Sequence, residues 1–171
     1  MASLCAATTG CLAIPRVGDD PQVECTRHFD LDSTAEPLGS SEAFIGAAEG
    51  FAAATNTSPT LDDIARSAGW RHDGWDRLLK IGDHNQSEDV NVYAGTSGIC
   101  FAGFVSSDPD RGGSDGWYIF FHGPDPVQTI RWGYDAVIET DGNPVLGRDE
   151  RLSPDQTVTP PVLRRTNSGT S

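Results

Sequence analysis

The apolar runs that can build a core lie in the middle of the chain. Residues 99–105, 117–122 and 127–134 read as strands, because aliphatic and aromatic residues dominate them and clusters of Gly, Pro, Asp or Ser bound them. In residues 117–122, bulky side chains alternate onto both sides of the strand. Such a strand belongs to a sheet that is covered on both faces or that keeps one face as an interaction surface.

Two helices are predicted ahead of these strands. Ser40 or Ser41 can cap the first, whose apolar residues recur at i, i+3, i+4 and i+7, and we expect it to end before Asn56. Thr60 can cap the second, which carries a carboxylate at its third helical position and ends at Gly69.

A further strand and a third helix are predicted before residue 99. Residues 77–81 read as the strand, and Ser87 can cap the helix, whose first turn contains two acidic residues. We expect its inward face to consist of Val90, Tyr93 and Ala94.

Later in the chain, residues 136–140 and 144–146 flank Asp141-Gly142-Asn143, which predicts a hairpin turn. Helices thus precede a run of strands. This order predicts an α+β fold: a single small domain with a mostly antiparallel sheet of four to six strands and two or three short helices packed on one face.

Both ends of the chain are poor in aromatic residues and rich in polar ones and proline. We expect residues 1–38 to be a disordered or weakly structured leader, with at most a short edge strand over 22–29, and residues 153–171 to be a disordered tail. The folded domain is predicted to span residues 40–152.

The charge is strongly negative, with 25 acidic against 12 basic residues and a net charge of −13. This balance repels phosphate backbones and anionic membrane surfaces, so nucleic acid and membranes are unexpected partners. All but one of the basic residues are arginine, as is common in a GC-rich genome. A more specific explanation is that an acidic face meets a basic protein partner.

Four cysteines are present, of which Cys5, Cys11 and Cys25 lie in the predicted leader. We expect Cys100 to be a small buried hydrophobe, since a Cys25–Cys100 bridge requires an oxidising compartment. The first fifteen residues lack the basic and apolar regions of a signal peptide, which favours a cytoplasmic location; an exported protein is the alternative if the true start lies upstream.

The histidines and acidic residues that could serve in catalysis or metal binding are not spaced as in a recognisable motif. His122 ends a predicted strand, and His84 lies beside carboxylates, but neither has further ligands or a nucleophile at set spacing. Asp108 and Asp110 begin like a calcium-binding loop, yet its twelfth position is Ile119 instead of an acid. No catalytic residue, metal or cofactor is therefore assigned.

The sequence predicts a non-enzymatic, acidic protein-binding domain, of which an inhibitor or an immunity-type protein is one concrete form. Two alternatives stay open: a small hydrolase or metal-dependent enzyme that uses His84, His122 and loop carboxylates, and an envelope-associated protein. The candidate binding residues are acids at the rim of the domain and aromatic anchors on the sheet, namely Asp83, Glu88, Asp89, Asp108, Asp110, Asp115, Trp132 and Tyr134.

Overall fold

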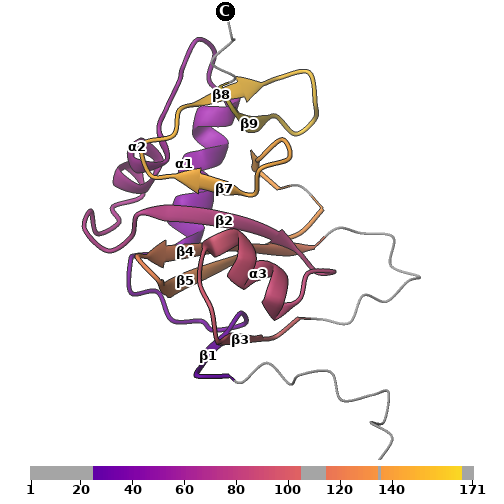
Figure 1. Ribbon diagram of the computed structural model, residues 1–171. Coiled ribbons are helices and arrows are strands. Elements are labelled where there is room, and N and C mark those ends of the chain that lie inside the picture. The colour runs from indigo at the N-terminus through magenta and orange to yellow at the C-terminus, as the bar shows by residue number, and fades with distance from the viewer. Residues whose placement is uncertain (1–24, 105–114, 135, 167–171) are drawn as a thin grey trace, which may run out of the picture.

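The computed structural model describes residues 25–104, 115–134 and 136–166. Its centre is an antiparallel four-stranded sheet in the order β5-β4-β2-β7 (Figure 1). The strands are β2 (Arg77–Gly82), β4 (Gly116–His122), β5 (Asp125–Trp132) and β7 (Val145–Gly147). The described residues form three helices and nine strands, which confirms the predicted α+β class.

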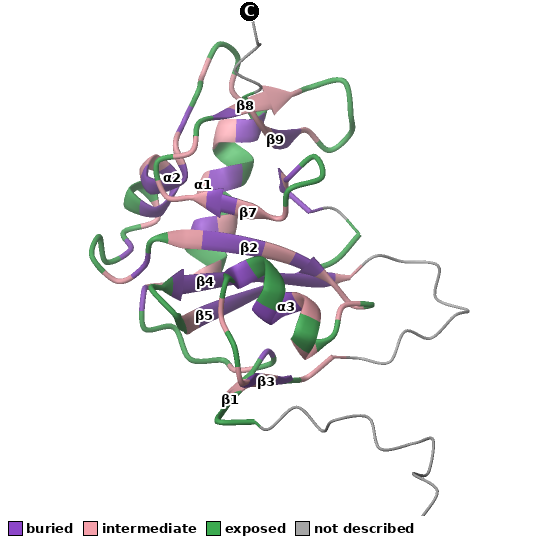
Figure 2. Ribbon diagram, viewed as in Figure 1, coloured by how far each residue is buried: buried purple, intermediate pink, exposed green. Residues whose placement is uncertain are grey.

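Strand β4 is buried on both sides. Five consecutive side chains, Trp117, Tyr118, Ile119, Phe120 and Phe121, have no solvent exposure, and the central strands are accordingly buried over most of their length in Figure 2. Tyr118 and Phe120 belong to one apolar cluster, whereas Trp117, Ile119 and Phe121 belong to a second. Alternation along the strand thus divides the core into two layers.

The first face of the sheet is covered by α1 (Ser41–Ala53), α2 (Leu61–Ser67) and a small sheet in the order β6-β9-β8. The strands of that sheet are β6 (Ile138–Glu139), β8 (Leu152–Asp155) and β9 (Val162–Arg165). Phe44 of α1 packs its ring edge-on against Phe120, with centroids 5.2 Å apart. This contact joins the first helix to the central strand.

The second face is covered by α3 (Ser87–Ala94) and a two-stranded parallel sheet of β1 (Arg27–Asp30) and β3 (Ile99–Ala102). Helices therefore lie on both faces, and the expectation that they cover one face is wrong. The physical reason is the burial of both sides of β4, which leaves neither face free of a cover.

The predicted starts of the first two helices are confirmed. The Ser40 hydroxyl accepts a hydrogen bond from the Ala43 N–H at 3.2 Å. In α2, the Thr60 hydroxyl accepts from the Asp63 N–H, and the Asp63 carboxylate accepts from the Thr60 N–H at 2.9 Å. The hydrogen bonds that the Thr60 N–H and hydroxyl donate to the Asp63 carboxylate lower the pKa of Asp63 below its ordinary value, because they favour the charged form.

Helix α3 forms where it is predicted, but its inward face differs. Val90 and Ala94 are buried, whereas Tyr93 is 44% exposed. Asn91 is buried in its place, and its amide donates to the carbonyls of Ser87 and Ile99 at 2.8 and 2.7 Å. Asn91 can lie inside because its amide satisfies two backbone carbonyls.

The predicted hairpin around Asp141 does not form. Asp141 and Gly142 do make a turn with positive φ, but β6 before it pairs with β9 and β7 after it pairs with β2. The turn therefore carries the chain from the small sheet to the central one.

Parts of the predicted leader and tail belong to the fold. Strand β1 pairs with β3, and Leu31 and Leu38 after it are buried. Leu163 of β9 is fully buried against the first cluster. The ordered region thus extends beyond residues 40 and 152, because single apolar residues in polar surroundings reach the core. Residues 1–24 and 167–171 lie outside the described residues.

None of the described helices is long and apolar enough to cross a bilayer.

Glycine at position 116 is required by the packing of the central sheet. A Cβ atom there would lie 2.0 Å from the Ile81 carbonyl oxygen and 2.4 Å from Cζ2 of Trp132. We expect Gly116→Ala to lower the free energy of unfolding by about 3 kcal/mol, because backbone atoms must move to admit the methyl group. Urea unfolding measures this change. Gly147→Ala on β7 is the control, since a methyl group added there would meet nothing within 4 Å; equal stabilities of the two variants would contradict this packing.

Candidate functional site

The two histidines considered for catalysis lie far apart. His84 follows Gly82 at the end of β2 that pairs with Gly116, whereas His122 is the last residue of β4. Six residues of extended strand separate Gly116 from His122, which corresponds to about 20 Å. The His84 side chain is 79% exposed, and its Nδ1 lies 3.6 Å from Oδ1 of Asp83. The two imidazoles therefore lie toward opposite ends of β4.

The acids predicted to form a binding rim are brought together in part. Asp83 and Asp115 are adjacent, because the Asp83 N–H donates to the Asp115 carbonyl at 2.9 Å. Asp89 accepts from the Gln86 N–H at the start of α3, and Glu88 beside it is exposed. Asp108 and Asp110, with the beginning of the calcium-loop pattern, lie outside the described residues.

The two aromatic anchors occupy different environments. Trp132 is 8% exposed and packs in the first cluster, with the Lys80 ammonium 4.8 Å from its ring centroid. Tyr134 lies beyond the end of β5 and is 72% exposed. An open aromatic sheet surface is therefore absent from the described residues, because both faces of the sheet are covered.

Asp62 of α2 is only 4% exposed and lies at the centre of an ionic cluster that was not predicted from the sequence. Its carboxylate pairs with Arg66, with Nδ1 of His72 at 3.2 Å and with Nε of Arg148 at 3.4 Å. Arg148 also donates to the His72 carbonyl at 2.7 Å. The cluster joins α2, the turn before β2 and the segment after β7.

This cluster has the carboxylate–histidine pair found in many hydrolases, but both ring nitrogens are occupied. Nδ1 faces Asp62, and Nε2 lies 3.4 Å from Arg148. A general base needs a free nitrogen toward its substrate or nucleophile. Among the described residues, no hydroxyl or thiol hydrogen-bonds to His72. The arrangement is therefore suited to stabilising the contacts between the three segments that it joins. The described residues also contain no group of three or more His, Cys, Asp and Glu side chains placed to hold a metal.

An open groove of about 980 Å³ runs between α1, β5 and the connection that follows β1. Three carboxylates line it, those of Asp32, Glu42 and Glu49, together with one cation, Arg131. Within the described part of the chain, none of the three carboxylates makes an ion pair, whereas Arg131 pairs with Asp115 at 3.5 Å. We call these three residues the groove acids.

The groove has an apolar floor and hydroxyl groups between its charges. Ala43 and Ile45 supply exposed aliphatic surface above Leu31 and Ile130, which are only 1% and 5% exposed. Ser33 and Thr34 supply hydroxyls. Figure 1 shows the indigo connection from β1 running past β5 to the start of α1. The lining combines features that serve protein recognition: apolar contact, hydrogen-bonding groups and charge.

Two buried polar side chains of β5 fix the connection that forms one wall. The Thr129 hydroxyl donates to the Leu31 carbonyl at 2.9 Å. The Gln128 amide accepts from the Leu38 N–H and donates to the Gly39 carbonyl, both at 2.9 Å. The wall is therefore held to the edge strand of the sheet at both of its ends.

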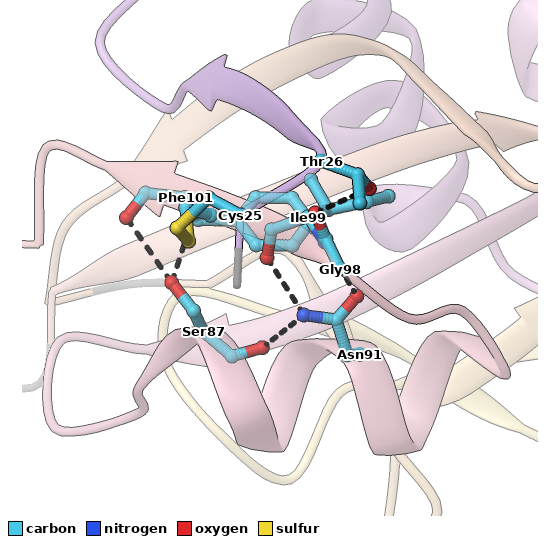
Figure 3. The surroundings of a disulfide bond; sticks show 8 residues. Cys25, Thr26, Ser87, Asn91, Gly98, Ile99 and Phe101 are labelled. Atoms are coloured by element: carbon cyan, nitrogen blue, oxygen red, sulfur yellow. Dashed lines mark hydrogen bonds between the residues drawn. A yellow bond between two sulfur atoms is a disulfide. The ribbon is translucent and has the colours of Figure 1, made fainter. Parts of the chain in front are cut away.

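A disulfide joins Cys25 to Cys100 at the start of the segment that leads through β1 to this wall (Figure 3). Cys100 is thus oxidised, and the expectation of an unpaired buried residue is wrong. Beside the disulfide, the Thr26 N–H and hydroxyl both donate to the Gly98 carbonyl, at 2.9 and 3.0 Å. The Ser87 hydroxyl accepts from the Phe101 N–H at 2.9 Å, which links β3 to α3.

Comparison with known protein families, with curated proteins and with solved structures returned no match for this chain.

The Asp62 cluster gives a stability prediction. We expect Asp62→Asn to lower the free energy of unfolding by about 2 kcal/mol, because a buried amide cannot replace the charge-assisted contacts of the carboxylate with Arg66 and Arg148. Urea unfolding followed by tryptophan fluorescence measures the change. Glu88→Gln removes one charge from an exposed position and is the control. A stability of Asp62→Asn within about 0.5 kcal/mol of wild type, the usual range for a surface substitution, would contradict the structural role.

Proposed function

We propose that this chain is a non-enzymatic protein-binding domain whose groove receives a basic segment of a protein partner. The observation that carries the proposal is the set of three groove acids, Asp32, Glu42 and Glu49, which have no cation partner among the described residues and lie beside an apolar floor. Some other surface acids are already neutralised, for example Asp155 by Arg164 at 2.8 Å. The groove acids are therefore available to a partner's lysine or arginine side chains.

The charge of the chain favours the same class of partner. A net charge of −13 attracts basic proteins over a distance of about one Debye length, roughly 10 Å at 0.1 M salt. Rim charges of this kind mainly raise the association rate, while buried apolar anchors slow dissociation. In this groove, the carboxylates serve the first role, and the aliphatic surface of Ala43 and the partly exposed Ile45 serves the second.

An inhibitor or immunity-type protein is a concrete form of this function. Such a protein must bind a basic enzyme or toxin without itself reacting, and a rigid surface makes that binding tighter. The hydrogen bonds of Gln128 and Thr129 support rigidity, because they hold the wall of the groove. The disulfide supports an oxidising compartment, since such bonds persist outside the reducing cytosol. We therefore favour the exported alternative over the cytoplasmic one.

The proposal is tested with two variants that remove the same amount of charge. The groove variant is Asp32→Asn/Glu42→Gln/Glu49→Gln, and the rim variant is Asp83→Asn/Glu88→Gln/Asp89→Asn. The probes are twelve-residue peptides that combine Lys or Arg with Leu, and charge-reversed peptides with Glu. We expect the groove variant to bind the basic peptides about tenfold more weakly, because exposed ion pairs contribute about 0.2–1 kcal/mol each. The rim variant should bind like wild type.

Stopped-flow kinetics and melting curves complete the test. For the wild type, the association rate should fall as salt rises while the dissociation rate stays nearly constant. Equal weakening of both variants would show that charge alone, and not the groove, attracts the peptide. Absence of binding to any basic peptide, or equal binding of the charge-reversed peptides, would overturn the proposed function.

A further inference from the structure

We propose that the Cys25–Cys100 disulfide is a redox control of the groove, so that a thiol reductant that opens it lowers affinity for the basic partner. This inference rests on the proposed function of the groove. It begins from the position of the bond. Cys25 is closely followed by β1, and β1 by residues 31–34, which form one wall of the groove. The disulfide thus fixes the first residue of the segment that runs from Cys25 through β1 to the wall at residues 31–34.

Strand β1 has few other supports. It has four residues and, within the described residues, pairs with β3 alone. A two-stranded sheet of this size is marginal in water. Arg27 forms an ion pair with Asp125, but both side chains are largely exposed, and such pairs contribute little. Phe29 is partly buried and packs edge-on against Phe101, with centroids 6.0 Å apart.

The bond lies near the surface and closes a long loop. Cys25 is exposed and Cys100 is half-buried. The two residues are 75 positions apart, and the constraint that a cross-link imposes grows with the length of the loop. Figure 3 shows the bond between β1 and β3, next to Ser87 at the start of α3.

The reaction needs only a reduced dithiol oxidoreductase, a class that has members in oxidising compartments, such as protein disulfide isomerase. A thiolate of the reductant attacks one sulfur atom, which breaks the S–S bond and forms a mixed disulfide. The second thiol of the reductant then displaces the protein sulfur. Two electrons and two protons have moved to the protein, which leaves Cys25 and Cys100 as thiols and the reductant as a disulfide.

Reduction is expected to loosen the wall without unfolding the domain. Leu31 remains anchored, because its side chain is buried, its N–H donates to the Ala102 carbonyl at 2.9 Å and its carbonyl accepts from Thr129. Asp32 and Ser33 lose the support of Asp30 at the end of β1, whose carboxylate accepts from the Asp32 N–H at 3.0 Å and whose carbonyl accepts from the Ser33 N–H at 3.2 Å. The partner must then order this segment when it binds, which costs affinity.

The experiment uses the full chain with Cys5→Ser and Cys11→Ser, so that Cys25 and Cys100 are its only cysteines. The dissociation constant for the basic peptide is measured for the oxidised protein, for the protein reduced with a phosphine, and for a Cys25→Ser/Cys100→Ser variant. We expect about fivefold weaker binding for both forms that lack the bond, as for other losses of preorganisation. The phosphine should not change binding by the Cys25→Ser/Cys100→Ser variant.

Hydrogen exchange of the amides in residues 26–34 provides a readout that does not depend on the peptide. Exchange should rise on reduction, while the near-ultraviolet circular dichroism of the buried tryptophans stays constant. Unchanged peptide affinity after reduction, or unchanged exchange in residues 26–34, would overturn the redox control. Failure of the oxidised protein to bind any basic peptide would instead overturn the proposed function. A rise in exchange on reduction would then show that the disulfide still controls residues 26–34, which distinguishes this failure from failure of the redox control.

Discussion

The architecture depends on the need to cover both faces of β4. Its side chains Trp117 to Phe121 point alternately to two sides of the sheet, and all five are fully buried. Exposing either face would cost the transfer free energy of at least two large apolar side chains, roughly 3–6 kcal/mol. The chain meets this constraint with α1, α2 and the small sheet on one face, and with α3, β1 and β3 on the other. The same requirement draws residues from both predicted tails into the fold.

Local signals made the helices and the main strands predictable. The hydroxyl of Thr60 and the carboxylate of Asp63 can be recognised as a helix start from sequence alone, and alternation reveals β4. By contrast, β9 offers only Val162 and Leu163 in a stretch rich in Pro and Thr, and its partners β6 and β8 are themselves short. Whether β9 joins the fold depends on which apolar surface the other elements leave uncovered, and only the assembled core determines that.

The candidate site was less predictable because no single segment contains it. Asp32, Glu42 and Glu49 come from a connection and a helix, and they become neighbours only when β5 packs beside α1. Asp62, His72 and Arg148 are likewise gathered from three segments. The signals present in the sequence were indirect: Glu42 and Glu49 lie seven residues apart, on the same side of an amphipathic helix. The rim acids predicted from the sequence lie in other segments than the groove acids.

The central claim is that the groove, rather than another acidic surface, receives a basic protein segment. Its most direct test is a titration of the isotope-labelled, oxidised protein with a Lys/Arg peptide, followed by amide chemical shifts in NMR. The account predicts that the largest shifts fall in residues 31–34, 42–49 and 129–131, and that they saturate at one peptide per protein. Shifts concentrated in residues 83–89 and at Asp115, or small shifts spread over all acidic residues without saturation, would contradict it.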